Sequence, residues 1–300
     1  MIGLQAVTMV IAVPGNLITI LTIITSRKLR ENVTYVFVLS VSIADFLVGL
    51  IAQPLFIGNI YTLSSNIRLC KAGVLTGFIC GGASISGIIG VTLDRFIYIV
   101  FPYKYQRILT RRRAIIFITV LWSFGIILGA VHLFWYDPTV VQVSMFILIT
   151  ISSLVSLKAN MKFLSLSRKA QRNTSKPSTL FTTQRTTSTV STLYTLSTTQ
   201  TTTSTTSTLP GLSVKKIKKQ LQVTRLILKI CLAFGVCWLP YGIFGLVHAT
   251  TETTSKYVVI AFYWGIAIGY SNSALNIIIY ARGNTVLTCE IKRFLDLRKK

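Results

Sequence analysis

Residues 33–58 are VTYVFVLSVSIADFLVGLIAQPLFIG, and Asp45 is their only charged side chain. A helix that crosses a bilayer needs roughly 20 consecutive residues that are mostly apolar. This stretch meets that requirement. Six others do so as well, at residues 2–26, 69–100, 114–135, 139–165, 221–249 and 257–281. The sequence therefore predicts an all-α fold, a seven-transmembrane helix bundle.

The composition of the 300-residue chain agrees with a membrane protein. Hydrophobic residues make up 52% of it and charged residues only 13%, with a mean hydropathy of +0.65. A water-soluble domain needs more polar residues to cover its surface, whereas lipid removes that need. The net charge of +24 can indicate nucleic-acid binding, but the basic residues lie between long apolar runs. We therefore expect the lipid bilayer as a partner, and no nucleic acid.

The basic residues are distributed unevenly between the two sides of the predicted bundle. Cytoplasmic loops of membrane proteins are enriched in Lys and Arg. One side carries only Arg68, Lys71 and Lys256. The other side carries the basic residues that follow the first, third and seventh spans or precede the sixth: Arg27, Lys28, Arg30, Lys104, Arg107, Arg111, Arg112, Arg113, Lys215, Lys216, Lys218, Lys219, Lys292, Arg293, Arg298, Lys299 and Lys300. The asymmetry predicts an extracellular N-terminus and a cytoplasmic C-terminus.

A long polar loop divides the chain between the fifth and sixth spans. We expect helices one to five in residues 1–172, a disordered third cytoplasmic loop in 173–213, helices six and seven in 214–282, and an amphipathic helix with a basic C-terminus in 283–300. In the loop, 25 of the 41 residues are Ser or Thr. Such a segment has too little apolar surface to fold. It is either a phosphorylation region or a spacer.

Both ends of the chain carry further membrane signals. The run at residues 2–26 lacks the basic segment of a signal peptide, so it is interpreted as the first span, and the extracellular N-terminus is either short or truncated. Cys289, near the other end, is a candidate for palmitoylation, although a lone cysteine there can also stay unmodified. Apolar residues around it recur at helical spacing between basic ones, which predicts a short amphipathic helix on the inner leaflet: Leu287, Ile291, Phe294 and Leu295.

Polar residues inside the spans are costly in lipid and therefore point to function. Asp45 lies half-way along the second span. Amide and hydroxyl side chains lie at comparable depth in other spans: Asn16, Ser84, Asn272, Ser273 and Asn276. Their oxygens would suit a small hard cation. The same residues can instead form an interhelical hydrogen-bond cluster that only holds the helices together, and the residues alone leave both interpretations open.

Short motifs follow one another along the spans. They are Gly15-Asn16, Ala44-Asp45, Asp94-Arg95-Phe96, Pro102, Tyr105, Trp122, Cys237-Trp238-Leu239-Pro240 and Asn276-Ile277-Ile278-Ile279-Tyr280. In this order they resemble the landmarks of rhodopsin-like (class A) G-protein-coupled receptors, over the whole chain except the Ser/Thr-rich loop. The resemblance implies a divergent plasma-membrane receptor that converts binding of an extracellular ligand into activation of a heterotrimeric G protein. It also implies kinases and arrestin as partners of the loop.

The resemblance assigns roles to individual residues. Asp94 would hold Arg95 at rest, and Arg95 would contact the G protein when the bundle opens. Gln220 stands where many relatives carry an acidic residue that completes this lock. The other activation residues would be Ile85, Phe234, Trp238, Pro240 and Tyr280. The allosteric sodium site of the family would be formed by Asp45, Ser84, Asn272, Ser273 and Asn276.

Two of these activation residues have a clear physical role. Pro240 removes a backbone hydrogen bond and should kink the sixth span. Trp238, two residues before it, is the ligand-sensing side chain of the family, and Ile85 and Phe234 occupy its packing-relay positions.

The chain departs from the family pattern at three places. Relatives join the cysteine at the position of Cys70 to the second extracellular loop, but residues 136–142 contain no cysteine, so we expect no such disulfide. The fifth span lacks its usual proline and tyrosine. Ile277 replaces the proline of the seventh-span motif. Because these changes affect the activation relay, a receptor-like protein that no longer couples is an alternative function.

The resemblance also predicts a ligand pocket. Gly77 stands where amine receptors carry the aspartate that binds the ammonium group, and a buried ammonium needs such a partner. Tyr270 stands where opsins carry the retinal lysine. We therefore expect a small-molecule, lipid or peptide ligand, and neither a biogenic amine nor retinal. The expected lining consists of Phe78, Trp238, Tyr241, Phe244, Ile266 and Tyr270.

A seven-span transporter or channel is the main alternative from another class. Such a protein should show inverted repeats, broken helices or several paired charges along a path, and the sequence shows none of them. We expect no enzyme, because the two histidines and the scattered serines form no nucleophile motif.

Overall fold

The structure is a computed structural model that describes residues 1–62, 66–101, 103–135, 137–175, 214–251 and 255–297. In these ranges, seven helical segments are long and apolar enough to cross a membrane. They are α1 (Ile2–Thr25), α3 (Val33–Leu47) continued by η1 (Val48–Ala52) and α4 (Gln53–Tyr61), α5 (Ile67–Val100), α7 (Arg111–Phe134), α8 (Pro138–Ser175), α9 (Val214–Thr250) and α10 (Lys256–Gly283). The predicted all-α bundle is confirmed.

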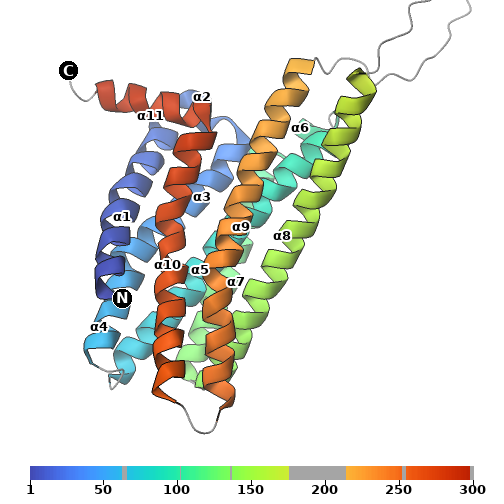
Figure 1. Cartoon of the computed structure of the whole chain (residues 1–300). Coiled ribbons are helices and arrows are strands. Elements are labelled where there is room, and N and C mark those ends of the chain that lie inside the picture. The colour runs from blue at the N-terminus through green and yellow to red at the C-terminus, as the bar shows by residue number, and fades with distance from the viewer. Residues whose placement is uncertain (63–65, 102, 136, 176–213, 252–254, 298–300) are drawn as a thin grey trace, which may run out of the picture.

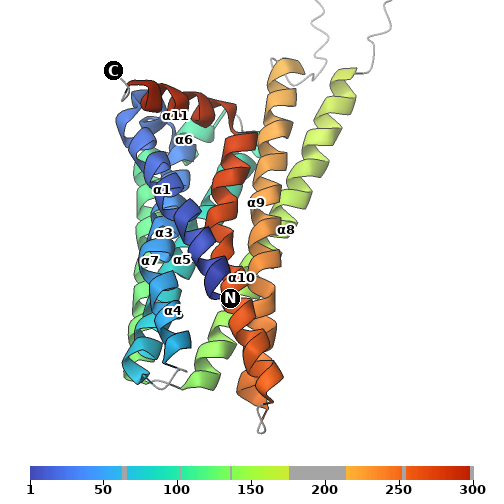
Figure 2. The same cartoon turned by 60° about the vertical axis from the view of Figure 1, so that its left-hand side comes forward.

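Three shorter helices connect or follow the spans: α2 (Arg27–Arg30), α6 (Tyr105–Ile108) and α11 (Thr285–Leu297). Helix α11 lies across one end of the bundle, beside the ends of α1 and α10 (Figures 1 and 2). This confirms the predicted helix after the seventh span. Below, the "α11 end" is the end of the bundle that carries this helix, and the "opposite end" is the other one.

Helix α5 is the central element of the bundle, because it packs against α3, α7, α8 and α9. Helix α10 lies between α9 and α1 and completes the arrangement. The contact between α5 and α7 requires glycine. A Cβ atom at Gly125 would lie 2.8 Å from the carbonyl oxygen of Phe78, and Gly82 faces Gly125 across the same contact.

The second span contains a π-helical turn, η1, directly before α4. Pro54 lies at the start of α4. Because proline has no N–H to donate to the carbonyl four residues earlier, a regular α-helix cannot pass through it unchanged, and the wider turn accommodates it. Single π turns are frequent near functional sites, and this one begins three residues after Asp45.

The structure changes one predicted boundary. Helix α8 continues through residues 173–175, which the sequence analysis assigned to the loop. Residues 176–213 lie outside the described residues, so the disordered loop stays a prediction.

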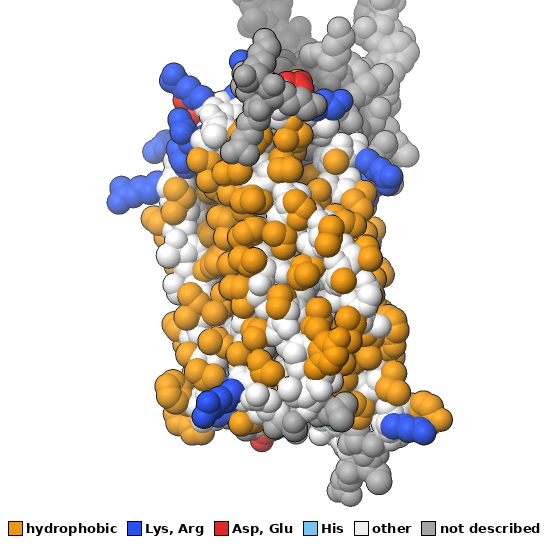
Figure 3. Space-filling view, turned by 90° about the vertical axis from the view of Figure 1, so that its left-hand side faces the viewer, with side chains coloured by type: hydrophobic (Ala, Val, Ile, Leu, Met, Phe, Trp, Pro, Cys, Tyr) orange, Lys and Arg blue, Asp and Glu red, His pale blue; other side chains and the backbone are white. Residues whose placement is uncertain are grey.

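The outer surface is apolar over its middle. Figure 3 shows hydrophobic side chains along the bundle and Lys and Arg side chains near its two ends. Val10 in α1, Val120 in α7 and Val236 in α9 are each more than half exposed. Side chains of this kind are stable in contact with hydrocarbon rather than water. The surface therefore fits a bilayer.

Candidate functional site

A buried carboxylate connects α3 with α10. Asp45 is 1% exposed, and Asn276 donates a hydrogen bond from Nδ2 to its Oδ2 at 2.9 Å. The Ser273 side chain is hydrogen-bonded to the same carboxylate. Asn16 on α1 donates from Nδ2 to the Ser273 carbonyl oxygen at 3.4 Å. Three helices thus meet at Asp45.

Several oxygens on α1, α3 and α10, the helices that meet at Asp45, have no hydrogen-bond partner among the described residues. Each is buried, and they comprise Asn16 Oδ1, Ser42 Oγ, Asp45 Oδ1, Asn272 Oδ1 and Asn276 Oδ1. Unpaired buried oxygens are costly. One carboxylate with several amide and hydroxyl oxygens is a donor set that fits a small hard cation.

Two other residues predicted for the cation site are also buried. Ser84 on α5 is 6% exposed and Asn272 on α10 is 2% exposed. The described side chains include no hydrogen bond from either of them to Asp45. Among the described residues, no group of three or more His, Cys, Asp or Glu side chains is placed to hold a metal ion. The arrangement around Asp45 is therefore unlike a transition-metal site.

A second charged cluster lies where α5 approaches the α11 end. Arg95 Nη2 and Asp94 Oδ2 form an ion pair at 2.7 Å. Thr34 Oγ1 donates to Asp94 Oδ2 at 2.8 Å, and the Tyr105 hydroxyl donates to Asp94 Oδ1 at 2.6 Å. Arg95 also contacts the Thr34 hydroxyl. The Asp94 carboxylate, fully buried, is thus held by three side chains from three segments.

Tyr105 in α6 is the member of this cluster that lies outside the spans. Burial, followed by the negative charge of Asp94, raises the pKa of the Tyr105 hydroxyl above its ordinary value. The phenol therefore stays protonated and keeps donating to Asp94 throughout the physiological pH range. Tyr105 was predicted only as a family landmark, and neither this hydrogen bond nor those of Thr34 were predicted.

Arg95 lines a cavity of about 680 Å³ that opens at the α11 end. Thr34, Tyr98 and Tyr105 contribute to its wall. Lys28 and Arg111 add positive charge, and Glu31 adds a carboxylate. The buried ion pair is thus placed next to a space that a partner can enter.

A third site is a pocket of about 540 Å³ at the opposite end of the bundle, between α4, α5, α8, α9 and α10. Four residues predicted for the ligand pocket line it, namely Trp238, Tyr241, Ile266 and Tyr270. The pocket also has polar side chains that were not predicted, among them Asn59, Gln142 and His248. The aromatic side chains of Phe56, Phe262 and Tyr263 were not predicted either.

Two residues predicted for this pocket lie elsewhere. Phe244 does not line it, and its side chain is 37% exposed on α9. Phe78 is 2% exposed and stacks on His132, with ring centroids 4.7 Å apart, beside a different cavity. In a membrane helix the outward face is as apolar as the inward face. The type of a residue therefore does not tell which of the two faces it lies on.

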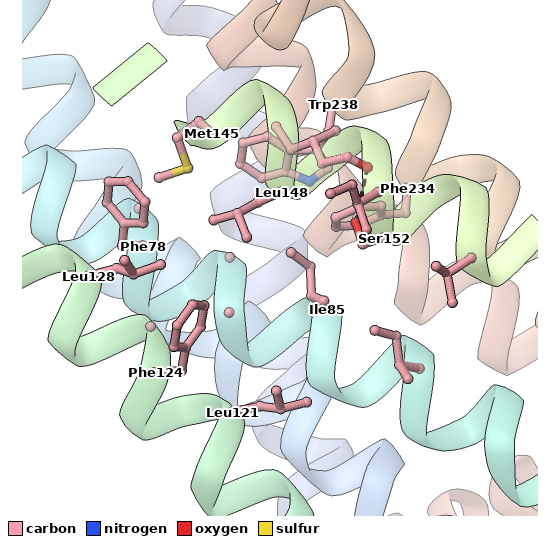
Figure 4. Close-up of a pocket in the computed structure, with 18 residues that line it drawn as sticks. Phe78, Ile85, Leu121, Phe124, Leu128, Met145, Leu148, Ser152, Phe234 and Trp238 are labelled. Carbon is pink, nitrogen blue, oxygen red and sulfur yellow. Dashed lines mark hydrogen bonds between the residues drawn. The ribbon is translucent and has the colours of Figure 1, made fainter. Parts of the chain in front are cut away.

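Trp238 joins the pocket to the interior of the bundle. Its ring centroid lies 5.9 Å from those of Tyr241 and Tyr270, and 6.2 Å from that of Phe234. The indole lies against Gly269, where a Cβ atom would be 2.9 Å from Trp238 Cε3. Ile85, Phe234 and Trp238 line one apolar cavity (Figure 4), which adjoins the ligand pocket at Trp238. The structure therefore brings the three predicted relay residues together.

The other predicted switch residues lie nearby in the spans. Tyr280 is 6% exposed and belongs to the same apolar cluster as Ile230 and Phe234. Pro240 lies inside α9. Gln220 also lies in α9, but its side chain is outside the described residues, as is Pro102.

Helix α11 is fastened to the bundle by apolar and polar contacts. Leu287 is 1% exposed, and Glu290 accepts a hydrogen bond from Ser26 Oγ at 3.0 Å. Cys289 is exposed on the same helix. Cys70, at the opposite end, has its sulfur 3.6 Å from Asn59 Oδ1. All five cysteines are described, and no disulfide joins them.

These three sites lie along a bundle whose sequence matches a known family. Residues 15–280 match the model of the "7 transmembrane receptor (rhodopsin family)". The chain belongs to this family. The match covers the Asp45 cluster, the Asp94–Arg95 pair and the Trp238 relay, and it confirms the resemblance carried by the sequence motifs. The protein is thus a multi-pass membrane protein of a family of receptors.

Three similar proteins are named as octopamine, dopamine and adrenergic receptors. The octopamine receptor beta-1R of Drosophila melanogaster is 24% identical over 95% of the chain and 59% of its own length. The human D(1B) dopamine receptor is 29% identical over 41% of the chain and 26% of its own length. The alpha-1A adrenergic receptor of Oryzias latipes is 30% identical over 41% of the chain and 27% of its own length. The chain thus spans 59% or less of the length of these relatives.

Proposed function

We propose that this receptor converts binding of a ligand in the pocket at the opposite end into activation of a heterotrimeric G protein at the α11 end. The observation that carries this proposal is the Asp94–Arg95 pair, in which Asp94 is buried and the partly exposed Arg95 lines the cavity at the α11 end. A buried ion pair with two discrete arrangements is a suitable switch element. Ligand binding shifts such a switch only if it favours one of the two states of the bundle.

The connection between the two ends runs through Trp238. It lines both the ligand pocket and the apolar cavity that Ile85 and Phe234 share. A ligand that moves the indole therefore changes the packing of α9 against α5. Since α9 also packs against α8 and α10, its displacement widens the bundle at the α11 end. Arg95 is then free to leave Asp94 and contact the G protein.

We further propose that the α11 end faces the cytoplasm. The α11 end carries Lys28, Arg111 and Lys292 among many basic residues, whereas the opposite end carries few. Cytoplasmic segments are enriched in this way. The Ser/Thr-rich loop between α8 and α9 is then available to kinases and arrestin, and exposed Cys289 to palmitoylation.

The orientation has a direct test in intact cells. An epitope tag after Lys300 is expected to bind antibody only after the plasma membrane is permeabilised, and a tag before Met1 is expected to bind without permeabilisation. Staining of the C-terminal tag on intact cells, with a cytosolic marker still protected, would contradict the proposal.

The Asp45 cluster is proposed as an allosteric sodium site, held by Asp45, Ser84, Asn272, Ser273 and Asn276. The unpaired buried oxygens support this proposal. A sodium ion bound there would balance the negative charge of the Asp45 carboxylate. The five residues lie on α3, α5 and α10, so an ion that they all bind would favour one arrangement of these helices.

The ligand is proposed to be neutral. The described lining of the ligand pocket is largely aromatic and aliphatic, with amide and hydroxyl groups and one histidine, His248, but no Asp or Glu. Gly77, at the position of the amine-binding aspartate, lines this pocket without a side chain. The names of the relatives favour an amine instead, and the comparisons give no support to a neutral ligand. The pocket chemistry carries the proposal, because an ammonium group buried without a carboxylate is strongly destabilised.

This ligand proposal predicts the effect of adding a carboxylate. A Cβ atom at Gly77 has only Met145 Cε, at 3.5 Å, as a close neighbour, so Gly77→Asp is expected to fold. The wild-type receptor is expected to give no response to octopamine or dopamine. The Gly77→Asp receptor is expected to bind these amines about tenfold more tightly than wild type, or better. The measurement is radioligand or calorimetric binding, with Gly77→Asn as the uncharged control. Saturable amine binding to the wild-type receptor, unchanged in Gly77→Asp, would overturn the proposal that the ligand is neutral.

The coupling proposal predicts a gain of activity when the ion pair is weakened. Asp94→Asn removes the charge that holds Arg95, so basal G-protein activation is expected to rise about threefold to tenfold. Tyr105→Phe removes one hydrogen bond to Asp94 but leaves the charge, and a smaller rise is expected. GTP turnover in cell membranes with matched surface expression measures both. Basal turnover unchanged by Asp94→Asn would favour a receptor that no longer couples.

A further inference from the structure

An apolar cavity of about 220 Å³ lies between α5, α7, α8 and α9, next to the ligand pocket but mostly separate from it (Figure 4). Its wall contains no ionisable side chain among the described residues. The polar groups in it are the Trp238 indole and the Ser152 hydroxyl, and Ser152 already donates to the Ile149 carbonyl oxygen at 3.0 Å. The cavity therefore offers almost no hydrogen bonds to water.

Glycines on α5 account for much of the space. A Cβ atom at Gly81 would meet no atom within 4 Å, and one at Gly77 would meet only Met145, at 3.5 Å. Both glycines line the cavity. By contrast, Gly82 is needed for close packing, since its Cβ would lie 3.2 Å from the Cα of Gly125. The space beside Gly81 is thus open, and close contact between helices does not require a glycine at this position.

The cavity opens toward the membrane. Phe124 on α7 and Ile151 and Val155 on α8 line it and are about half exposed. All three lie within spans, so their exposed surface faces hydrocarbon. Helix α7 packs against α5, and α8 against α9 and α5, while the described parts of α7 and α8 make no extensive contact with each other. The opening therefore lies between α7 and α8.

We propose that this cavity binds the acyl chain of a bilayer lipid, which enters between α7 and α8. An apolar cavity of about 150 Å³ is already large enough to bind benzene, and this one is larger. The nearly unbroken apolar wall matches a hydrocarbon chain, and the polar head of the lipid stays outside. No aqueous ligand is needed, because the opening is in contact with acyl chains.

The occupant would touch the activation relay. Ile85, Phe234 and Trp238 form the inner wall, toward α9 (Figure 4). A chain that fits one packing of these three side chains better than another shifts the balance between the two states of the bundle. This effect on signalling rests on the proposed function, whereas binding of the chain does not.

Binding is tested with photoreactive lipid and the full-length receptor. The receptor is placed in lipid nanodiscs that contain phosphatidylcholine with a diazirine in its acyl chain, and labelled residues are identified by mass spectrometry. Phe234 is the diagnostic residue, because it is 4% exposed and lines the cavity. Labelling of Phe234 is expected for wild type. Labelling confined to outward residues such as Val120 would overturn the proposal, because it shows contact with bulk lipid alone.

Filling the cavity supplies the matched comparison. Gly81→Leu is expected to lower Phe234 labelling about tenfold, because the new side chain occupies the space, and Gly81→Ala to lower it less. Gly3→Leu is the control, because Gly3 also has no atom within 4 Å of an added Cβ and lies outside the cavity. Equal labelling of Phe234 in wild type, Gly81→Leu and Gly81→Ala would overturn the proposal.

The identity of the occupant is tested in the same nanodiscs with a photoreactive sterol. Labelling of Phe234 by the sterol, without labelling by the phosphatidylcholine chain, would overturn the acyl-chain assignment. None of these measurements uses a G protein. A failure of lipid binding is therefore distinguishable from a failure of coupling.

Discussion

Replacement of Arg95 by alanine is expected to lower G-protein activation by about tenfold or more, while the receptor still folds and reaches the plasma membrane. The loss of a contact made only in the activated state reduces activation without reducing ligand binding. Arg95 is partly exposed to the cavity at the α11 end, so it is available to a partner once it leaves Asp94. The measurement is GTP turnover at matched surface expression.

The control for Arg95→Ala separates coupling from folding. The variant leaves Asp94 buried, with the hydroxyls of Thr34 and Tyr105 as its remaining partners. An Arg95→Lys variant keeps the positive charge but loses the planar guanidinium, and is expected to retain a fraction of the activity. Full activity in Arg95→Ala, with normal expression, would show that Arg95 does not carry the coupling.

Replacement of Asp45 by asparagine is expected to remove the sodium dependence of the receptor. Asparagine has nearly the same size and still accepts from Asn276, but it carries no charge to bind a cation. The purified wild-type receptor is expected to be stabilised by sodium over potassium at equal ionic strength. The stabilisation should reach about 2.7 kcal/mol when sodium is at 100 times its Kd. The Tm of Asp45→Asn should be the same in both salts.

A control carboxylate distinguishes this site from a general salt effect. Asp137 caps α8, where its Oδ1 accepts from the Thr139 amide at 2.8 Å. Asp137→Asn is therefore expected to keep the full difference between sodium and potassium. If wild type shows no such difference, or if Asp45→Asn retains it, the cluster is a structural hydrogen-bond network.

Much of the fold was predictable because bilayer thickness fixes the length of an apolar helix. The fourth span, expected at residues 114–135, is α7 at Arg111–Phe134. The π turn in the second span was not foreseen, although Pro54 was a visible signal for it. The end of α8 was placed too early because helices continue beyond the apolar part of a span, where the sequence becomes polar.

The candidate sites were predictable to different degrees. Charged and amide residues are rare in lipid, so Asp45, Asn276 and the Asp94–Arg95 pair stood out. The hydrogen bonds of Thr34 and Tyr105 depend on contacts between distant segments, which no spacing reveals. The apolar cavity could not be predicted. A glycine in the sequence does not reveal whether the space beside it is filled by a neighbouring helix or open, as it is at Gly81.

The most direct test of the account is guanine-nucleotide exchange with purified components. The receptor is reconstituted in nanodiscs, and exchange is measured on purified heterotrimers from each G-protein subfamily, with empty nanodiscs as the reference. For at least one heterotrimer, wild type is expected to exceed empty nanodiscs, Asp94→Asn to exceed wild type, and Arg95→Ala to match the empty discs. If wild type and Asp94→Asn both match the empty discs for every heterotrimer, the receptor does not activate G proteins.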